Sequence, residues 1–231
     1  MGSRATAAKE PAHGGRTAEP GRVEAFSDGV LAIVVTLLVL ELDPPSEPGA
    51  MLTELVEQWP GYLAYLASFG YVAVIWVNHH ELFTRIRVVD VGLLWRNLLL
   101  LLTTSFLPFP TAVLSTAFQH GTPADQAAAL VLYCVLAAAM GTSWLVVFQH
   151  LCHHPRLLGA GTPPAFFAGE RRRSAVGIAA YAVAAGSAGW QPFLGLGIAA
   201  ALPVFYALTS RGWGDRRAAT PGTGADALAD D

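Results

Sequence analysis

Residues 22–42 read RVEAFSDGVLAIVVTLLVLEL, and this stretch decides the fold. It is almost wholly apolar after its first turns and is long enough for a helix to cross a bilayer, which takes about 20 residues. The breaker DPPSEPG at residues 43–49 ends that helix. Arg22, Ser27 and Asp28 stand at its start, where charge near hydrocarbon is costly unless it is paired or hydrated. The stretch therefore predicts a membrane helix that carries a functional or architectural polar cluster.

The composition of the whole chain also favours a membrane protein. Of its 231 residues 53% are hydrophobic and only 13% are charged, and the mean hydropathy is +0.44. Soluble domains carry about a quarter charged residues, and a soluble protein this apolar would expose large apolar patches. The net charge of −3 gives no basic field for a nucleic acid backbone. The expected partner is the lipid bilayer, with no nucleic acid.

Six apolar runs of about the length of a membrane span predict an all-α membrane protein with six transmembrane helices. The expected helices cover residues 25–42, 59–78, 91–118, 124–149, 174–188 and 192–208. Pro108 and Pro110 predict a bend in the outer half of the third helix. A loop is expected over residues 150–173.

The basic residues predict the orientation. The chain has fourteen Lys and Arg, and all of them lie before the first helix, around the connection between the second and third, after the fourth, or after the sixth. The three opposite loops carry none, so the positive-inside rule places both termini in the cytoplasm. We expect a disordered cytoplasmic head over residues 1–21, a six-helix membrane domain over residues 22–211 and a disordered cytoplasmic tail over residues 212–231.

One face of the first helix is a stripe of branched aliphatic side chains. At about 100° per residue, Ile33, Leu37 and Leu40 fall within about 60° of one another, and Thr36 flanks them. Asp28 lies about 140° away from Ile33. Geometry alone leaves lipid contact, helix packing and pore lining open, and it favours the first two.

The first helix closely resembles the signature of the transmembrane protein 175 family of potassium channels. The resembling pattern is R-x-x-x-F-S-D-G-V-x-A-I-x-x-T-L-L-V-L, starting at Arg22. Further matches are W-x-x-H-H-x-x-F from Trp76, the Asn-Leu pair at Asn97, and F-x-P-F-x-T from Phe106. The resemblance covers about half of the chain, because the last three helices match only in number and character.

The resemblance implies a potassium channel of the bacterial inner membrane and not an enzyme. Bacterial members carry one six-helix repeat per chain and form homotetramers, with the first helix lining a central pore. The constriction would fall on Ile33, Leu37 and Leu40, and the Thr36 hydroxyl would help to favour potassium over sodium. Apolar rings of this kind can gate by dewetting, and they penalise the weakly hydrated potassium ion less than sodium. Potassium is the expected permeant ion, and no cofactor is expected.

The polar cluster of the first helix is interpreted as a brace. The predicted topology returns the two histidines at the end of the second helix to the depth of Asp28. We therefore predict a hydrogen-bond network that would keep Asp28 ionised despite burial. Its expected members are Arg22, Ser27, Asp28 and one histidine, His79 being favoured over His80, with Trp76 and Asn78 nearby.

Two other classes of function stay open. A proton-leak channel or a proton-coupled transporter would use Asp28 and His79 as its relay. A membrane enzyme would need a metal held by His150, His153 and His154. Zinc sites require a defined four-ligand geometry with supporting second-shell hydrogen bonds, and Pro155 follows this segment at once, so no metal site is expected.

Overall fold

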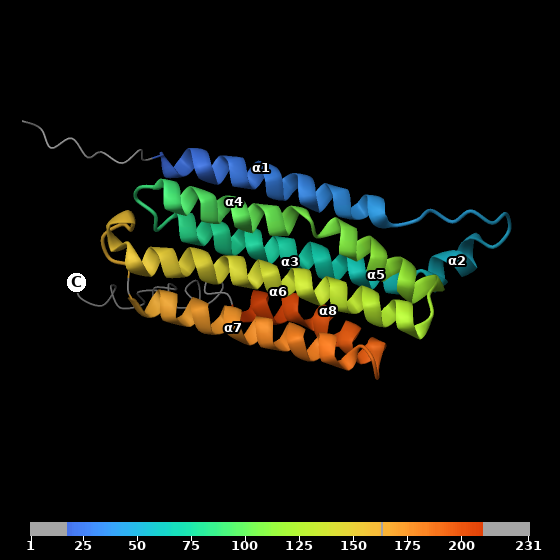
Figure 1. The fold of residues 1–231 in the computed structure, drawn as a ribbon. Helices are drawn as coiled ribbons and strands as arrows, with labels where there is room; N and C mark the ends of the chain where they lie inside the picture. Colours follow the sequence, from blue (N-terminus) through green and yellow to red (C-terminus); the bar gives the residue numbers. More distant parts are fainter. Residues whose placement is uncertain (1–17, 163, 210–231) are drawn as a thin grey trace, which may run out of the picture.

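The computed structural model describes residues 18–162 and 164–209. Figure 1 shows an elongated bundle of roughly parallel helices, with α1 at one edge and α7 near the opposite one. Within those ranges the only β pairing consists of two isolated antiparallel bridges, between Ala18 and Val89 and between Ile86 and Leu158. The first 17 residues of the expected head and the whole expected tail lie outside the described residues.

The chain forms eight α-helices and two short 3₁₀ turns in the described ranges. In order they are α1 (Pro20–Leu38), η1 (Val39–Glu41), α2 (Met51–Glu57), α3 (Trp59–Phe83), α4 (Val91–Ser105), α5 (Pro108–His120), α6 (Pro123–His153), η2 (Pro155–Leu157), α7 (Pro164–Ser187) and α8 (Pro192–Thr209). The first helix thus begins two residues inside the stretch expected to be a disordered head, with Pro20 in its first turn.

Five of these segments are long and apolar enough to cross a membrane within the part of the chain that the structure describes. They are α1 with η1, α3, α4 with α5, α6, and α8. The helix α7 is not among them, because it is too highly charged. Every stretch of 18 residues within its 24 residues includes the four charged residues Glu170, Arg171, Arg172 and Arg173. The predicted all-α fold is confirmed for the described residues, which contain five candidate membrane spans where six were expected.

The fourth connection is shorter than predicted. The helix α6 continues to His153 and stops where Pro155 opens η2, and α7 already begins at Pro164. The prediction of a loop over residues 150–173 is therefore wrong at both ends. The fifth helix was expected to begin only after Arg173, but a helix tolerates charged side chains wherever it extends beyond the hydrocarbon. Arg173 illustrates this, since its guanidinium pairs with Glu170 one turn earlier at 2.7 Å.

The predicted bend in the third span is confirmed. The helix α4 ends at Ser105 and α5 begins at Pro108, so Phe106 and Leu107 form the break. Pro108 and Pro110 supply no amide donor and cannot continue the α-helical ladder. The Thr111 hydroxyl donates to the Leu107 carbonyl at 2.8 Å and satisfies one of the acceptors near the break.

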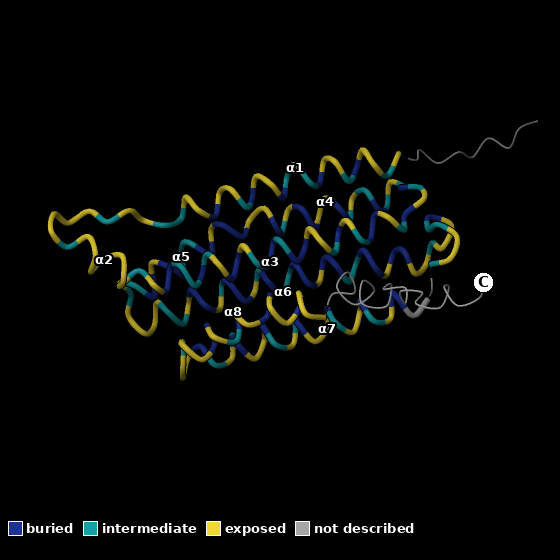
Figure 2. The backbone as a smooth tube through the Cα atoms, turned by 180° about the vertical axis from the view of Figure 1, so that it is seen from behind, coloured by how far each residue is buried: buried dark blue, intermediate teal, exposed yellow. Residues whose placement is uncertain are grey.

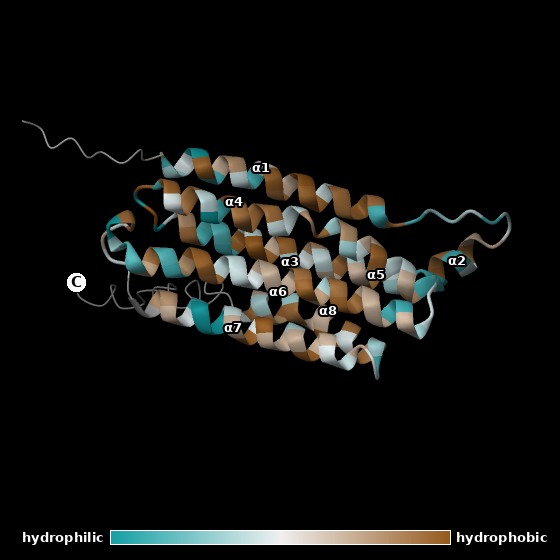
Figure 3. Cartoon of the chain, viewed as in Figure 1, coloured by the Kyte–Doolittle hydropathy of each residue, from teal (hydrophilic) through white to brown (hydrophobic). Residues whose placement is uncertain are grey.

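The charged residues separate to opposite ends of the bundle. The start of α1, the α3–α4 connection and the α6–α7 connection share one end, which we call the basic end (Figure 1). Its arginines include Arg22, Arg85, Arg87, Arg156 and Arg173. The other end, near α2, carries Glu47, Glu54, Glu57 and Asp125, and we call it the acidic end. Figure 3, in which the ribbon is coloured by residue hydropathy, shows most of the hydrophobic positions between the two ends.

The centre of the bundle is built on α3 and α6. The helix α3 packs against α1, α5 and α8, and α6 packs against α4, α5, α7 and α8. Buried hydroxyls join α3 to α5 and α6. Ser68 Oγ of α3 lies 2.7 Å from Thr111 Oγ1 of α5 and 3.1 Å from the Tyr133 hydroxyl of α6. A small residue allows α7 and α8 to approach each other, because the Tyr206 hydroxyl of α8 lies directly against Gly177 of α7.

Candidate pore helix and its polar brace

The helix α1 has two unlike faces. One is a buried stripe with helical spacing, consisting of Val23, Ser27, Leu31, Val34 and Leu38. This stripe faces α3 and α4, the main neighbours of α1. In the apolar stretch of α1 with η1 that could cross a membrane, only 28% is buried inside the bundle, against 33–50% for the other four candidate spans. Figure 2 shows the resulting alternation of buried and exposed turns along α1. The single chain therefore holds α1 from one side only.

The predicted constriction residues all lie on the exposed face. Ile33 is 60% exposed, Leu37 41% and Leu40 74%. Thr36 is exposed between them, and its hydroxyl donates to the Ile33 carbonyl at 2.8 Å. Because the hydroxyl proton is used within the helix, the oxygen lone pairs of Thr36 remain available to accept from water or to contact a cation.

A buried hydrogen-bond network ties α1 to α4 and α3. The Asn97 side chain accepts from His79 Nε2 at 2.9 Å and donates to Ser27 Oγ at 2.9 Å. Ser27 in turn donates to the Val23 carbonyl at 2.9 Å. The three side chains are at most 3% exposed, so each of these bonds is shielded from water. We call this the Ser27–Asn97–His79 network.

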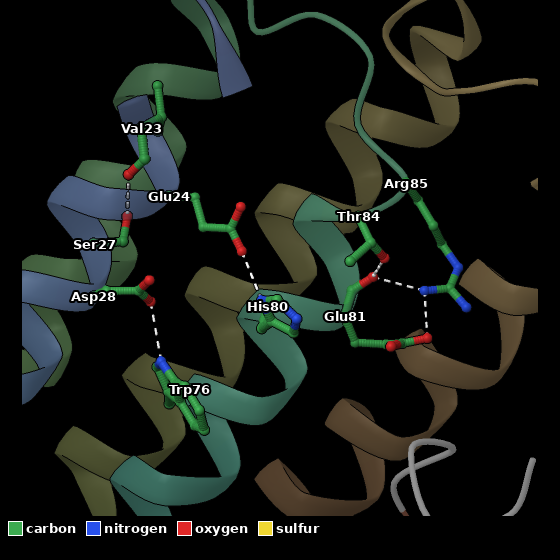
Figure 4. Close-up of polar contacts among 9 residues, drawn as sticks. All are labelled: Val23, Glu24, Ser27, Asp28, Trp76, His80, Glu81, Thr84 and Arg85. Atoms are coloured by element: carbon green, nitrogen blue, oxygen red, sulfur yellow. Dashed lines mark hydrogen bonds and ion pairs between the residues drawn. The ribbon is translucent and has the colours of Figure 1, made fainter. Parts of the chain in front are cut away.

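Two more exposed contacts join α1 to α3 at the same level (Figure 4). Trp76 Nε1 donates to Asp28 Oδ1 at 3.0 Å. One turn closer to the basic end, His80 Nδ1 lies 2.8 Å from Glu24 Oε1. Both carboxylates belong to α1 and both partners belong to α3, so α1 is fixed in rotation as well as in depth.

The predicted brace is divided between the buried Ser27–Asn97–His79 network and the outer, exposed contacts between α1 and α3. Ser27 and His79 share the buried network, and Asp28 and Trp76 share the outer one, but no hydrogen bond joins Asp28 to His79 among the described residues. Neighbouring side chains on a helix point about 100° apart, so His80 faces the acidic residues of α1 while His79 turns inward.

Arg22 and Asn78 also depart from the prediction. The Arg22 side chain makes no hydrogen bond or ion pair with any described residue. It lies about 20° from Ile33 around α1 and therefore points along the exposed face. Asn78 instead accepts from Arg173 Nη2 of α7 at 3.0 Å.

Asn97 is central to the brace, but the predicted network did not include it. The sequence does mark this residue, because a lone amide in an otherwise apolar membrane run needs a buried partner. His79 Nδ1 is buried and has no hydrogen-bond partner in the described part of the chain. The link from His79 to α1 passes through the Asn97 amide, which does not titrate, so the network fits a structural joint better than a proton relay.

A further polar cluster stands at the start of α4. Asp90 caps that helix by accepting from the Leu93 amide at 2.7 Å and pairs with His150 Nε2 at 2.9 Å. Burial alone would raise the pKa of Asp90. The hydrogen bonds from Leu93 and His150 and the charges of His150 and His154 outweigh burial, so the pKa lies below its ordinary value.

Known proteins share this arrangement of helices and motifs. The family described as endosomal/lysosomal potassium channel TMEM175 matches residues 22–108. A potassium channel of Streptomyces collinus is 35% identical over 205 residues, which are 88% of this chain and 98% of that protein. A crystal structure of a lysosomal potassium-selective channel TMEM175 homolog from Chamaesiphon minutus matches with a TM-score of 0.71 at 32% identity, over 82% of this chain and 96% of that one.

A shorter match links the chain to an animal protein. The human endosomal/lysosomal proton channel TMEM175 is 42% identical over 76 residues, which are 29% of this chain and 15% of the human protein. The two bacterial matches named above cover 98% and 96% of the matched chains, and the family model covers the first helix of this chain. The chain belongs to the TMEM175 family of ion channels.

Proposed function

We propose that this chain is the subunit of a channel that conducts potassium in preference to sodium, with four copies placing α1 around a central pore. The observation that carries the proposal is the exposed face of α1. A helix held from one side presents Ile33, Thr36, Leu37 and Leu40 together, where a ring of copies would form the narrowest part of a pore. The bacterial relatives named above are called potassium channels, which supports the choice of ion.

The proposed subunit crosses the membrane six times, with α7 as its fifth crossing. The helix α6 runs from the acidic end to the basic end, and α8 finishes near the basic end, where Arg173 Nη1 donates to the Thr209 carbonyl at 3.1 Å. The chain must therefore return to the acidic end along α7. Under the positive-inside rule the basic end, with both termini, lies in the cytoplasm of a bacterial cell with this channel in its inner membrane.

The proposed conduction mechanism follows from the side chains of the exposed face. Rings of Ile33, Leu37 and Leu40 form an apolar constriction in which an ion loses part of its water shell. Potassium is the more weakly hydrated ion and loses less hydration free energy than sodium. The outward lone pairs of Thr36 replace part of that shell. Acidic residues at the outer end raise the local cation concentration at the pore mouth.

Potassium flux into liposomes that contain the purified protein tests the pore assignment. Ile33→Asn puts a polar ring into the constriction, and we expect a faster flux and a lower potassium-to-sodium ratio. Val183→Asn is the matched control, because Val183 is 62% exposed on α7, away from α1. If both variants keep wild-type flux and selectivity, α1 does not line the pore. Light scattering of the purified protein should give four chains, and a stable monomer that conducts would contradict the tetramer.

Proton conduction is a second candidate function, because the human relative is called a proton channel and Asp28 places a carboxylate on α1. The measurement is proton flux in potassium-free solution, driven by a pH gradient. A flux that Asp28→Asn abolishes would establish this function. The potassium proposal expects a potassium flux that persists in that variant wherever the protein still assembles.

A further inference from the structure

Three metal-ligating side chains meet at the basic end. Asp90 precedes α4, and His150 and His154 lie one turn apart at the end of α6. One ligand atom from each residue lies within 4.8 Å of the other two. The carboxylate comes from a position 60 residues before His150, so the set of His150, His153 and His154 considered from the sequence did not contain it.

Asp90 can ligate a metal without giving up its cap. Its Oδ1 accepts both from the Leu93 amide at 2.7 Å and from His150 Nε2 at 2.9 Å. Across residues 18–162 and 164–209 no hydrogen bond engages Oδ2. The side chain therefore holds the start of α4 with one oxygen and offers the other.

The two histidine rings are held in orientation. His154 Nδ1 donates to the His150 carbonyl at 2.9 Å, which leaves the lone pair on Nε2 free for a metal. Metal-binding histidines commonly donate their other ring N–H to such an acceptor. The His150 and His154 rings stack with their centroids 4.1 Å apart. Gly92 makes the room, because a Cβ there would lie only 2.7 Å from His150 Cε1.

The neighbouring donors of the same segment point elsewhere. His153 Nδ1 donates to the Gln149 carbonyl at 2.7 Å, and the residue is exposed. Cys152 is also exposed and lies about 160° from His150 around the helix. Neither belongs to the cluster, so both provide internal controls.

We propose that Asp90, His150 and His154 bind a divalent transition metal ion of the zinc class, with water completing the coordination. Two imidazoles with one carboxylate suit zinc, nickel and copper better than magnesium or calcium. Tetrahedral ligand atoms at about 2.1 Å from one zinc ion lie about 3.4 Å apart. Because the three ligand atoms already lie within 4.8 Å of one another, small movements of the side chains suffice for binding. This proposal does not depend on the proposed channel function.

A bound ion would clamp the first turn of α4 to the last turn of α6. Two turns further along α4, Asn97 holds Ser27 of α1 at 2.9 Å. The clamp therefore stiffens the helix against which α1 is braced. Metal at the basic end would stabilise the packing of α1 without contacting its exposed face.

The site is tested by calorimetric titration of the full chain with zinc chloride. The protein is purified in detergent without an affinity tag, and magnesium chloride serves as the control titrant. We expect one zinc ion per chain, no magnesium binding, and at least tenfold weaker zinc binding in His154→Ala and Asp90→Asn. His153→Ala, from the same turn, should stay within about twofold of the wild type. No saturable zinc binding, or equal losses in His153→Ala and His154→Ala, would overturn the proposal.

A measurement on the wild type protects the test against variants that fold poorly. The zinc K-edge absorption spectrum of the loaded protein should show nitrogen and oxygen neighbours with the pattern of two imidazoles. A sulfur neighbour would assign the zinc to Cys152 and reject the site. Circular dichroism of each metal-free variant should match the wild type before its titration is read as a loss of ligand.

Discussion

Replacing Asn97 with leucine should loosen α1 from the bundle more than any other single change in the brace. The amide is 3% exposed and bonds to two helices, accepting from His79 Nε2 and donating to Ser27 Oγ. Leucine removes both bonds while filling the site with a side chain of similar size. His79 would then be left with two buried ring nitrogens that lack partners, since Nδ1 already has none among the described residues.

The expected cost follows from these bonds. Side-chain hydrogen bonds in membrane proteins contribute about 0.6 kcal/mol each on average and about 1.7 kcal/mol at most. A buried donor left without a partner costs about 1–3 kcal/mol. The two contributions overlap, because part of the second is the loss of the first. We therefore expect Asn97→Leu to lower the free energy of unfolding by about 2 kcal/mol.

The assay is equilibrium unfolding of the purified protein in mixed micelles with a rising fraction of denaturing detergent. Ser105→Ala is the matched control, because Ser105 is an exposed residue of the same helix whose hydroxyl donates only to the Leu102 carbonyl. It should change stability by less than about 0.5 kcal/mol. A double-mutant cycle with Ser27→Ala should give a coupling of about 0.5–1.5 kcal/mol. Additive effects would refute a direct joint between α1 and α4.

Two other substitutions test the packing in the same assay. Trp76→Phe keeps an aromatic ring but removes the donor to Asp28. Because this contact is exposed, the free energy of unfolding should fall by only about 0.5–1 kcal/mol. A loss as large as that of Asn97→Leu would mean that the exposed contacts carry the brace. Gly177→Ala places a methyl group against the Tyr206 hydroxyl and should cost about 1–3 kcal/mol. Gly186→Ala, in the same helix with nothing within 4 Å, should be neutral or stabilising by up to about 1 kcal/mol; equal effects at the two glycines would contradict the contact between α7 and α8.

The two faces of α1 could be predicted because a single helix obeys one angular rule. Counting about 100° per residue groups Ile33, Leu37 and Leu40, and the structure exposes all three. The same count places Arg22 beside Ile33 and away from Asp28, so its absence from the brace was also contained in the sequence. The prediction is wrong there because residues close together at one end of a helix need not lie on the same face of it.

The partners across helices could not be predicted in the same way. Whether His79 or His80 meets an acidic residue of α1 depends on the rotation of α3, which is set by packing against α5 and α8. The pairing of Asp90 with His150 joins residues 60 positions apart, and no local pattern encodes it. Helix ends were also uncertain at α7, because charge marks the end of the hydrocarbon and not the end of the helix.

The distribution of contacts along α1 bears on how the proposed channel would gate. Every polar side-chain contact from α1 to another helix in the described chain involves Glu24, Ser27 or Asp28. Beyond them α1 packs through Leu31, Val34 and Leu38, whose apolar contacts have no directional requirement. A shift of the half that carries the proposed constriction therefore breaks no hydrogen bond to another helix, while the half at the basic end stays anchored. The brace and the constriction are separate parts of one helix, so brace variants should change stability and assembly before they change ion selectivity.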